Sequence, residues 1–520
     1  MEKTGKGNLL INAALCILGV LLIFSLIWHG VKLFGGTENE KETKIVLYEG
    51  PKTLKDAAAE DLANVPEDQR DFTLKHCVDT KVTICGQDCY VYDTNVNHSR
   101  TWSGNYLPNI SRTPITYFDF EGRADIVITV PETELDSVSV SPLSYGIVPA
   151  VDKDAHTVSF SVTEPNTYTV MFNNSPERAL HIFANPLEKE EDLPDFDDEN
   201  TLYVGPGEWD ISNIIVDSGQ TLYISGGAVI HGTVNASFAD DVKVMGRGII
   251  DGSTYEGWKG ESARIPLRFD YCEGVEVEGV IALNANAWVF QGFQTTDLKV
   301  DNIKIISSRP NGDGISLQSC SNSEVTNCFV RSWDDSLVVK NYSVNSVGIT
   351  FSHIQLWTDF AQSMEIGYET NKGNKKNSAI QNITFSDILV LHNYHIPVIS
   401  VHNADDAGVR NITFSNITVE DAQMGSGDGA SLPYLIDLHI TQNGNWSTTE
   451  ERGTISNVLI ENVKVISGKF CASRIKGYDE GHTIEGITIR NLEILGQKIT
   501  DFETGKFEID EATTADLIIE

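Results

Sequence analysis

Two short acidic segments carry the residue types best suited to chemistry. Residues 311–318 read NGDGISLQ and residues 333–340 read WDDSLVVK, so each is a polar corner followed by an alternating segment typical of a strand. Asp313 and Asp335 hold the same place in the two segments. If the strands are neighbours, these two acids and Asp334 crowd within one strand spacing, roughly 5 Å. Crowded carboxylates repel, so at least one should keep its proton near neutral pH.

Such a group would supply the chemistry of glycosidic bond hydrolysis. A protonated acid donates to the leaving oxygen while an ionised carboxylate activates a water molecule. The plain alternative is that Asp-Gly and Asp-Asp are turn residues that end a coil. Two acidic corners in the same register favour the catalytic interpretation, with Asp313, Asp334 and Asp335 as the candidate residues.

Side chains at comparable positions of adjacent segments are predicted to line a groove around these acids. Strand alternation places Ser316, Val338 and Glu365 in one outward row and Gln318 and Lys340 in the next. Aromatic rings in such a groove would stack on the C–H faces of sugars. The sugar-binding residues predicted from these positions are Asn286, Trp288, Trp333, Lys340, Glu365 and His402.

Several of these side chains have a simpler interpretation. Trp333 is expected to face the site because it abuts Asp334, although an aromatic stack inside the fold is the alternative. Glu365 either hydrogen-bonds sugar hydroxyls or forms an ordinary ion pair with Lys340 on the neighbouring strand. A lone histidine such as His402 is more often structural than functional.

A short phrase repeats along the chain after about residue 201. It has the form apolar-x-apolar-x-polar-apolar-x-apolar, as in ITFSHIQL, ITFSDILV and ITFSNITV, and such self-similarity indicates a solenoid. Short β segments joined through one polar corner predict a right-handed parallel β-helix. A β-propeller is disfavoured because it needs evenly spaced hairpins. The corner residues predicted to tolerate left-handed conformations are Asn302, Asn327, Asp387, Asn416, Asn462 and Asn491.

The chain divides into four predicted regions. Residues 9–28 carry no charge and are long enough to cross a bilayer, so residues 1–33 are expected to hold an uncleaved signal anchor, with a cleaved signal peptide as the alternative. Residues 34–45 form a linker. Short alternating runs over 46–190 predict an antiparallel β-sandwich, and 191–520 form the β-helix. We expect the catalytic part to lie outside the cell, at the membrane or secreted.

Composition limits the partners and the cofactors. The net charge is −36, with 74 acidic against 38 basic residues, which excludes nucleic acid and weakens the case for a polyanionic substrate. Cys77, Cys85 and Cys89 lie close enough in sequence for a disulfide. The cysteine spacings match no zinc signature, so neither metal nor cofactor is predicted. The Asp405-Asp406 pair is expected to be a solvated loop and not a cation site.

The acidic corners, with ISGGAVIHG at 224–232 and GRGIIDG at 246–252, resemble motifs of the pectin-lyase-like glycoside hydrolases with a parallel β-helix. The nearest groups are the polygalacturonases of family 28 and the dextranases and isopullulanases of family 49. Asn311-Gly312-Asp313 resembles the polygalacturonase N-T-D signature, and Trp333-Asp334-Asp335 resembles G-D-D. The resemblance implies inverting hydrolysis, with Asp334 as general acid and with Asp313 and Asp335 positioning and deprotonating the water.

Later family signatures are missing, and this affects the expected substrate. Gln362 stands where the family's H-G histidine is expected, and residues 397–402 carry no basic pair in place of R-I-K. Residues 474–476 spell R-I-K, but several segments too late. Because that Arg and Lys contact a uronate carboxylate, their absence implies a neutral glycan. By their motif positions, Asn311 and Gln362 join the predicted sugar-binding residues.

The combined expectation is an all-β, membrane-anchored, inverting glycoside hydrolase that acts on a neutral, α-glucan- or dextran-like glycan. One alternative is a pectin-type hydrolase in which Lys340 or Arg309 contacts the uronate. Others are a non-catalytic glycan-binding surface protein and a polysaccharide lyase, although lyases usually need calcium and a basic residue. Insertions at 367–379 and 421–451 are expected to flank the groove, where they could close one end.

Overall fold

The computed structural model describes most of the chain beyond residue 42. The described residues are 43–57, 65, 70–97, 111–131, 133–257, 260–425 and 433–520. The predicted signal anchor at 9–28 and most of the predicted linker lie outside these ranges. Within them, no helix is both long enough and apolar enough to cross a membrane.

The N-terminal part consists of two sheets that share one apolar cluster, to which Phe118, Ile126 and Val170 belong. All of the strand pairings are antiparallel except that of β6 with β12, which is parallel. The first sheet contains β1 (Lys44–Leu47), β2 (Lys75–His76), β5 (Val91–Val96), β6 (Ser111–Glu121), β8 (Val138–Ser141), β11 (Asn166–Phe172) and β12 (Leu180–Pro186). The second contains β3 (Lys81–Ile84), β4 (Gln87–Cys89), β7 (Ala124–Thr129), β9 (Ala150–Asp152) and β10 (Thr157–Val162).

The clustered cysteines of these sheets are not joined to one another. Cys77, Cys85 and Cys89 are all free thiols, so the disulfide suggested by their closeness in sequence is not formed. Cys77 instead donates its S–H to Asp79 at 3.1 Å. The two sheets are therefore held by packing and hydrogen bonds.

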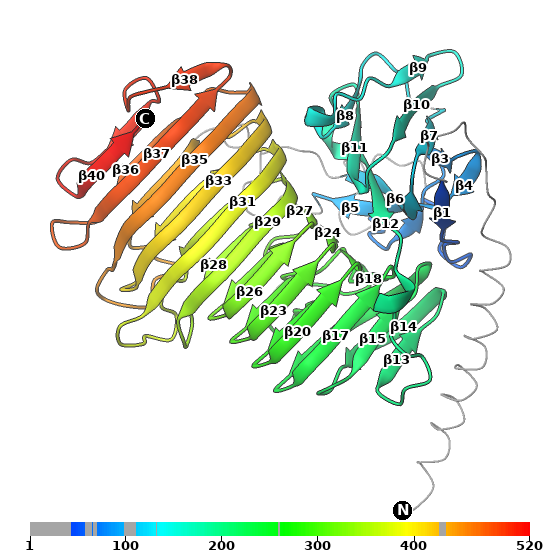
Figure 1. Cartoon of the computed structure of the whole chain (residues 1–520), viewed down its shortest axis with the longest axis horizontal. Coiled ribbons are helices and arrows are strands. Elements are labelled where there is room, and N and C mark those ends of the chain that lie inside the picture. The colour runs from blue at the N-terminus through cyan, green and yellow to red at the C-terminus, as the bar shows by residue number, and fades with distance from the viewer. Residues whose placement is uncertain are drawn as a thin grey trace, which may run out of the picture.

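Residues 201–520 form a parallel β-helix, whose coils run from β13 to β40 in Figure 1. One face stacks β13 (Thr201–Val204), β15 (Thr221–Ile224), β17 (Asp240–Gly246), β20 (Glu273–Glu278), β23 (Thr296–Asp301), β26 (Ser321–Thr326) and β40 (Thr514–Ile519). Five long strands belong to this face and bend around the corner into the next: β29 (Ser346–Thr358), β31 (Ala379–Asn393), β33 (Gly408–Ala422), β35 (Thr454–Gly468) and β37 (Ile484–Ile494).

Two further faces complete the coils. The second contains β14 (Gly207–Ile215), β16 (Ala228–Ser237), β18 (Ile249–Asp251), β21 (Ile281–Leu283), β24 (Lys304–Ile306) and β27 (Phe329–Ser332). The third contains β19 (Leu267–Asp270), β22 (Phe290–Phe293), β25 (Ile315–Gln318), β28 (Leu337–Lys340), β30 (Met364–Tyr368), β32 (Ile399–Asn403), β34 (Tyr434–Ile440), β36 (Ala472–Lys476) and β39 (Phe507–Ile509). β38 (Gln497–Ile499) pairs antiparallel with β37, and short 3-10 turns cover Leu143–Tyr145, Pro176–Arg178, Glu190–Asp192 and Gly260–Ser262.

The repeated phrase forms the coil corner, as the sequence predicts. All six predicted corner residues have φ between 53° and 56°, a left-handed conformation that Asn and Asp tolerate better than other side chains. Side chains at these corners also form a hydrogen-bonded ladder, in which Asn416 donates to Asp387 at 3.0 Å and Asn462 donates to Asn416 at 2.9 Å. Apolar side chains on either side of the corner point into the coil, where Phe351, Phe385 and Phe414 stack at 4.9 Å spacing.

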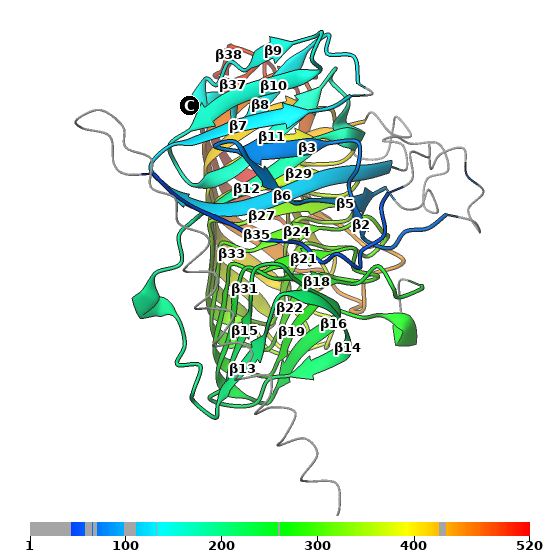
Figure 2. The same ribbon diagram turned by 90° about the vertical axis from the view of Figure 1, so that its right-hand side faces the viewer.

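The N-terminal sheets lie against the second face of the β-helix, and Figure 2 shows their strands crossing its coils. A single apolar cluster spans the contact and includes Tyr92, Tyr117, Phe183, Ile281, Ile306 and Phe329. Buried polar pairs cross it too, among them Arg247 Nε with Asp119 Oδ2 at 3.1 Å. Because this contact removes much apolar surface from water, the two parts form one structural unit. The N-terminal sheets lie on the second face and do not cover the third face of the coils.

Candidate active site

The third face brings the two acidic corners together. Ile315 pairs with Leu337 in the register of β25 and β28, which sets Asp313 beside Asp335 on successive coils. The main chain ties the corners directly, because Gly314 N donates to Asp335 O at 2.8 Å. A Cβ on Gly314 would lie 2.5 Å from Ser336 O, so only glycine permits this approach. The fold therefore brings Asp313 and Asp335 side by side, as the sequence predicts.

Main-chain amides orient two of the carboxylates. Asn311 N donates to Asp334 Oδ2 at 2.9 Å, and Gln362 N donates to Asp335 Oδ1 at 3.1 Å. Asn311 and Gln362, both predicted to bind sugar, thus act on the acids through their backbone. Gln362 belongs to the next coil, so three consecutive coils fix the group.

Beneath the acids runs a ladder of buried hydroxyls that sequence reasoning missed. Ser332 Oγ donates to Asp334 O at 2.6 Å and contacts Ser336 Oγ at 2.7 Å. The ladder continues through Thr358 to Ser363 at 2.8 and 2.7 Å. Ser332 and Ser336 belong to one coil, and Thr358 and Ser363 belong to the next. Such a hydrogen-bonded series holds the acidic corner rigid.

The three carboxyls favour their protonated forms. Burial, followed by the charge of Asp335, raises the pKa of Asp334 to about 7. Burial, with Asp334 and Glu369 nearby, raises the pKa of Asp313 to about 8 although Lys340 opposes the shift. Burial and the charge of Asp313 likewise raise the pKa of Asp335 well above its ordinary value. The group therefore retains protons near neutral pH, as a proton donor to a leaving oxygen requires.

Lys340 is the counter-charge of this group. Its Nζ lies 3.5 Å from Asp313 Oδ2 and 3.3 Å from Glu369 Oε2, and 4.9 Å from the centroid of the Trp288 ring. Burial opposes the lysine's charge, but the two carboxylates outweigh it and raise its pKa well above the ordinary value. Glu369 was not predicted, although it directly follows the strand of Glu365.

A pocket opens next to the acids. Its lining residues come from loops at both ends of the third-face strands: Gly260, Ala263, Ile265, Ala287, Trp288, Asn311, Tyr342, Glu369, Lys372, Asn445 and Trp446. Asn311 links the pocket to Asp334, and Glu369 links it to Asp313 through Lys340. Of the predicted sugar-binding residues, Trp288 and Asn311 lie on its wall.

Trp333 does not face the site, contrary to the prediction. It is fully buried and stacks on Phe360 with ring centroids 4.6 Å apart. The adjacent Asp334 is instead directed to Asn311 N on the preceding coil. Asn286 is also fully buried, and its side-chain amide donates to Glu256 O and Ser262 O at 2.8 Å. Asn286 therefore shapes the loop before β19 and cannot contact a sugar directly.

Glu365 and His402 form a closed pair and do not line the groove. Both are fully buried, and His402 Nδ1 lies 2.9 Å from the Glu365 carboxylate. The second ring nitrogen lies 2.9 Å from Asp437 Oδ2, and these two carboxylates outweigh burial and raise the pKa of His402 to about 10. The alternative ion pair of Glu365 with Lys340 is not formed either, because Glu365 pairs with His402 and Lys340 pairs with Asp313 and Glu369. Asp437 was missed since only the register shows it beside Ser400.

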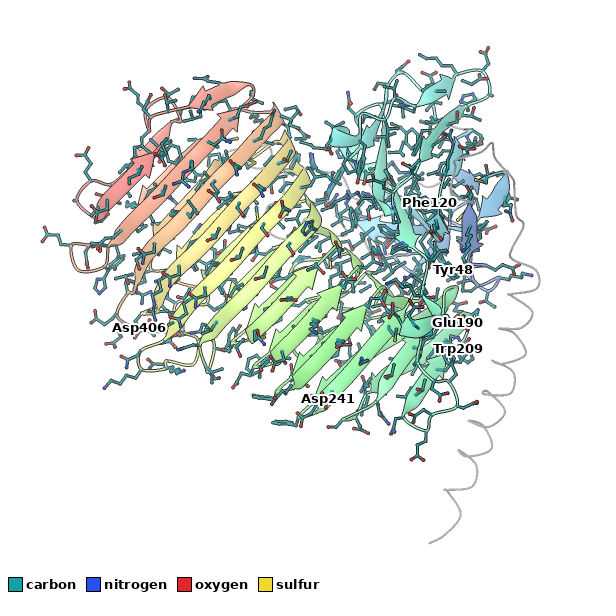
Figure 3. All side chains as sticks on the ribbon, in the orientation of Figure 1. Tyr48, Phe120, Glu190, Trp209, Asp241 and Asp406 are labelled. Carbon is teal, nitrogen blue, oxygen red and sulfur yellow. The ribbon has the colours of Figure 1, made fainter. Side chains whose placement is uncertain are left out.

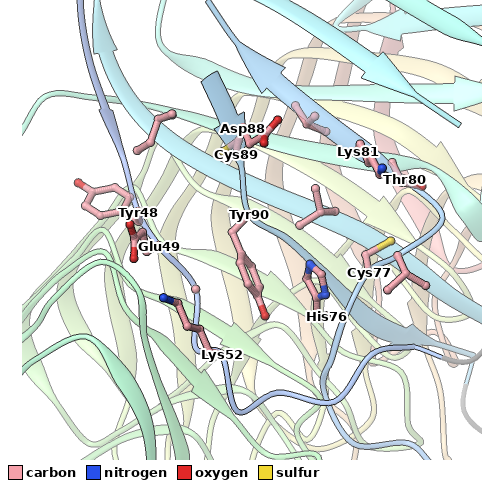
Figure 4. Close-up of a pocket in the computed structure, with 15 residues that line it drawn as sticks. Tyr48, Glu49, Lys52, His76, Cys77, Thr80, Lys81, Asp88, Cys89 and Tyr90 are labelled. Carbon is pink, nitrogen blue, oxygen red and sulfur yellow. The ribbon is translucent and has the colours of Figure 1, made fainter. Parts of the chain in front are cut away.

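A second pocket lies in the N-terminal sheets (Figure 4) and has a different character. Its walls include Tyr90, His76, Lys52 and Cys77. Burial raises the pKa of the Cys77 thiol well above its ordinary range, which makes it a poor nucleophile. His76 is engaged with Asp56 at 2.8 Å. This pocket lacks the crowded carboxyls found on the β-helix.

Comparison with known proteins assigns the chain to a family. The family model for glycosyl hydrolases family 28 matches residues 220–506, more than half of the chain. The chain belongs to this family. A polygalacturonase from Brassica napus is 32% identical over 108 residues, which are 19% of this chain and 27% of that protein. The match thus spans little more than a quarter of the relative's length.

One solved structure shows the likeness of fold for this family 28 member. Dex49A from Penicillium minioluteum has a TM-score of 0.64 at 15% identity, over 94% of this chain and 99% of that chain. A hyperthermoactive exopolygalacturonase from Thermotoga maritima has a TM-score of 0.42 at 17% identity, over 62% of this chain and 84% of that chain. The predicted resemblance to parallel β-helix glycoside hydrolases is confirmed.

Removal of the Lys340 charge is expected to shift the pH dependence of activity. Lys340 lowers the pKa of all three aspartates, so Lys340→Met should raise those pKa values and move both limbs of the kcat/KM profile to higher pH. A shift of one pH unit would reduce activity about tenfold on the acid limb. The control is Lys464→Met, which removes an exposed lysine paired with Glu493 at 3.4 Å. An unchanged profile in the Lys340 variant would contradict this role.

Proposed function

We propose that this family 28 protein hydrolyses glycosidic bonds with inversion, using Asp334 as general acid and Asp313 with Asp335 as the water-activating pair. The observation that carries the proposal is the grouping of three buried carboxyls with raised pKa values on adjacent coils. One proton must be present and another absent for acid and base to act together. Repulsion within the group favours a state with one proton bound and another lost, and the resemblance of Trp333-Asp334-Asp335 to the family's G-D-D signature is what assigns the donated proton to Asp334.

The proposed reaction needs no cofactor. Asp334 gives its proton to the glycosidic oxygen as the bond from that oxygen to the anomeric carbon breaks. A water molecule attacks the same carbon from the opposite face, and its proton passes to Asp313 or Asp335. The products are a free sugar hydroxyl and a hemiacetal of inverted configuration. Transfer of a proton from the aspartate pair back to Asp334 through solvent restores the starting state.

We infer a neutral sugar at the cleavage point. Lys340 is held between two carboxylates, and Arg309 donates to main-chain carbonyls at 2.6 and 3.2 Å. Arg474 pairs with Asp437 at 2.7 and 2.8 Å, four strands beyond β28 on the third face. A cation that is already paired or hydrogen-bonded within the protein gains less from binding a uronate carboxylate. Lys372 on the pocket wall and the Brassica napus relative favour the alternative, a polygalacturonase-type activity.

A glycan panel tests the proposal. Purified protein is incubated with dextran, isomaltotetraose and polygalacturonate, and the first product is followed by proton NMR, which reports both the linkage cleaved and the anomer released. We expect new reducing ends from dextran and isomaltotetraose, first seen as the inverted anomer. Cleavage of polygalacturonate alone would establish the alternative substrate. Retention of configuration, or no cleavage of any member, would overturn the proposed mechanism.

A further inference from the structure

Two inserted loops border the pocket beside the acids. One follows β30, covers residues 369–378, and places Glu369 and Lys372 on the pocket wall. The other follows β34, covers residues 441–453, and places Trp446 there. These loops belong to coils on either side of β32, yet they meet at one pocket. Hydrogen bonds from the intervening coil reach both loops.

That connection is the buried carboxylate of Asp405, at the corner after β32. Its Oδ2 accepts the N–H of Asn371 at 3.1 Å, and its Oδ1 accepts the N–H groups of Thr448 and Thr449 at 2.6 and 3.0 Å. Asp405 is fully buried, so the expected solvated loop is wrong for this residue. Its neighbour Asp406, labelled at the edge of the coils in Figure 3, is only half-buried. Charge-assisted bonds to three backbone donors hold both loops in one geometry.

Further hydrogen bonds hold the second loop directly after Trp446. Ser447 Oγ donates to Ala404 O at 2.6 Å, and Thr448 Oγ1 donates to Asn371 O at 3.1 Å. Trp446 directly precedes these residues and remains 36% exposed. Hydrogen bonds therefore hold the backbone beside this partly exposed indole, as the preorganisation of a binding group requires.

We propose that Trp446 and Trp288 form a subsite that binds a pyranose ring by stacking, and that Asp405 is the positioning residue that sets this subsite. The inference rests on the proposed function for the sugar chemistry of the ligand. Both indoles line the same pocket, and Lys340 lies over the ring of Trp288. Indole faces suit the C–H faces of sugars. Because Asn311 and Glu369 connect this pocket to Asp334 and Asp313, the subsite lies next to the bond that is cleaved.

The test separates sugar binding from turnover. Asp405→Asn keeps the size of the side chain but removes its charge and puts an amide N–H against backbone donors. Trp446→Ala removes the ring and leaves the anchor. Both are made in the wild-type chain for kinetics and in the Asp334→Asn chain for calorimetric titration with isomaltotetraose and, separately, tetragalacturonate. The matched control is Asp301→Asn, whose carboxylate accepts bonds from Thr326 and Asn327 at another corner.

Each variant is expected to raise KM and the dissociation constant about tenfold, with kcat changed less than threefold. The double variant should lose little more affinity for the tetrasaccharide than either single variant, because Asp405 acts through Trp446. Weakened binding of either tetrasaccharide supports the subsite, even if the wild type cleaves neither and the proposed function fails. Unchanged affinity in Trp446→Ala overturns the subsite. A fall in kcat without a change in KM for Asp405→Asn overturns the positioning role of Asp405. If Asp405→Asn does not fold, Trp446→Ala still tests the subsite.

Discussion

Replacement of Asp334 by Asn is expected to lower kcat by about 10²- to 10⁴-fold, the usual contribution of a positioned general acid. The amide keeps the shape of the carboxyl and can still accept the bond from Asn311 N, but it has no proton to give to a leaving oxygen. Rates are measured on the best glycan of the panel at the pH optimum. A substrate whose leaving group needs no protonation, such as a dinitrophenyl glycoside, should recover much of the rate.

The stability of the same variant provides an independent check. The pKa of Asp334 is raised to about 7 in the fold, above its ordinary value near 4, so the folded state binds the extra proton. Its stabilising effect is therefore complete below about pH 4 and is lost as the pH rises through about 7. Asp334→Asn should match the wild type in melting temperature at pH 4 and exceed it at pH 8. Retained turnover, or a lower melting temperature at pH 8, would contradict the assignment.

Replacement of Arg331 by Met is expected to lower the free energy of unfolding by about 3–5 kcal/mol, because it leaves a buried carboxylate without its partner. Arg331 and Asp359 are both fully buried, and two guanidinium nitrogens meet the carboxylate at 3.0 and 3.2 Å. The guanidinium also lies 3.2 Å from His181 Nε2 and donates to Pro176 O at 3.1 Å. The pair therefore joins the β-helix to the N-terminal sheets. Urea unfolding measures the change.

Two further variants isolate this effect. Arg490→Met removes an exposed arginine that pairs with Glu520 at 2.9 Å, and such surface pairs contribute about 0–1 kcal/mol. Adding Asp359→Asn to Arg331→Met removes the stranded charge and should recover part of the stability. A cost below about 1 kcal/mol for Arg331→Met would mean that the contact between the two parts does not depend on this pair.

The sequence was sufficient to predict features set by local backbone rules. The corner asparagines were predictable because a left-handed residue recurs at the same place in each phrase, and coil stacking follows from that repeat. The pairing of Asp313 with Asp335 followed as well, since equal spacing from two strand starts gives equal register. Resemblance in two short motifs was then enough to indicate the family.

Side-chain direction and partners at a distance depended on the tertiary structure. Trp333 and Asp334 are adjacent, yet Trp333 stacks on Phe360 while Asp334 accepts a bond from Asn311 N, and alternation rules do not apply at a corner. Glu365 pairs with His402, and Lys340 pairs with Glu369, a residue just past the strand that alternation does not place in either row. The role of Asp405 depends on a loop more than forty residues away in sequence.

By itself, then, the sequence determined the coil repeat, the acidic corners and their place on neighbouring strands, because these follow from periodicity and from the conformations that Asn, Asp and Gly allow. Only the tertiary structure decided which polar side chains are buried in pairs and which wall the pocket. Burial changes the energetics of a charge by several kcal/mol, and whether a group is buried depends on segments that come together only when the coils and their loops have packed.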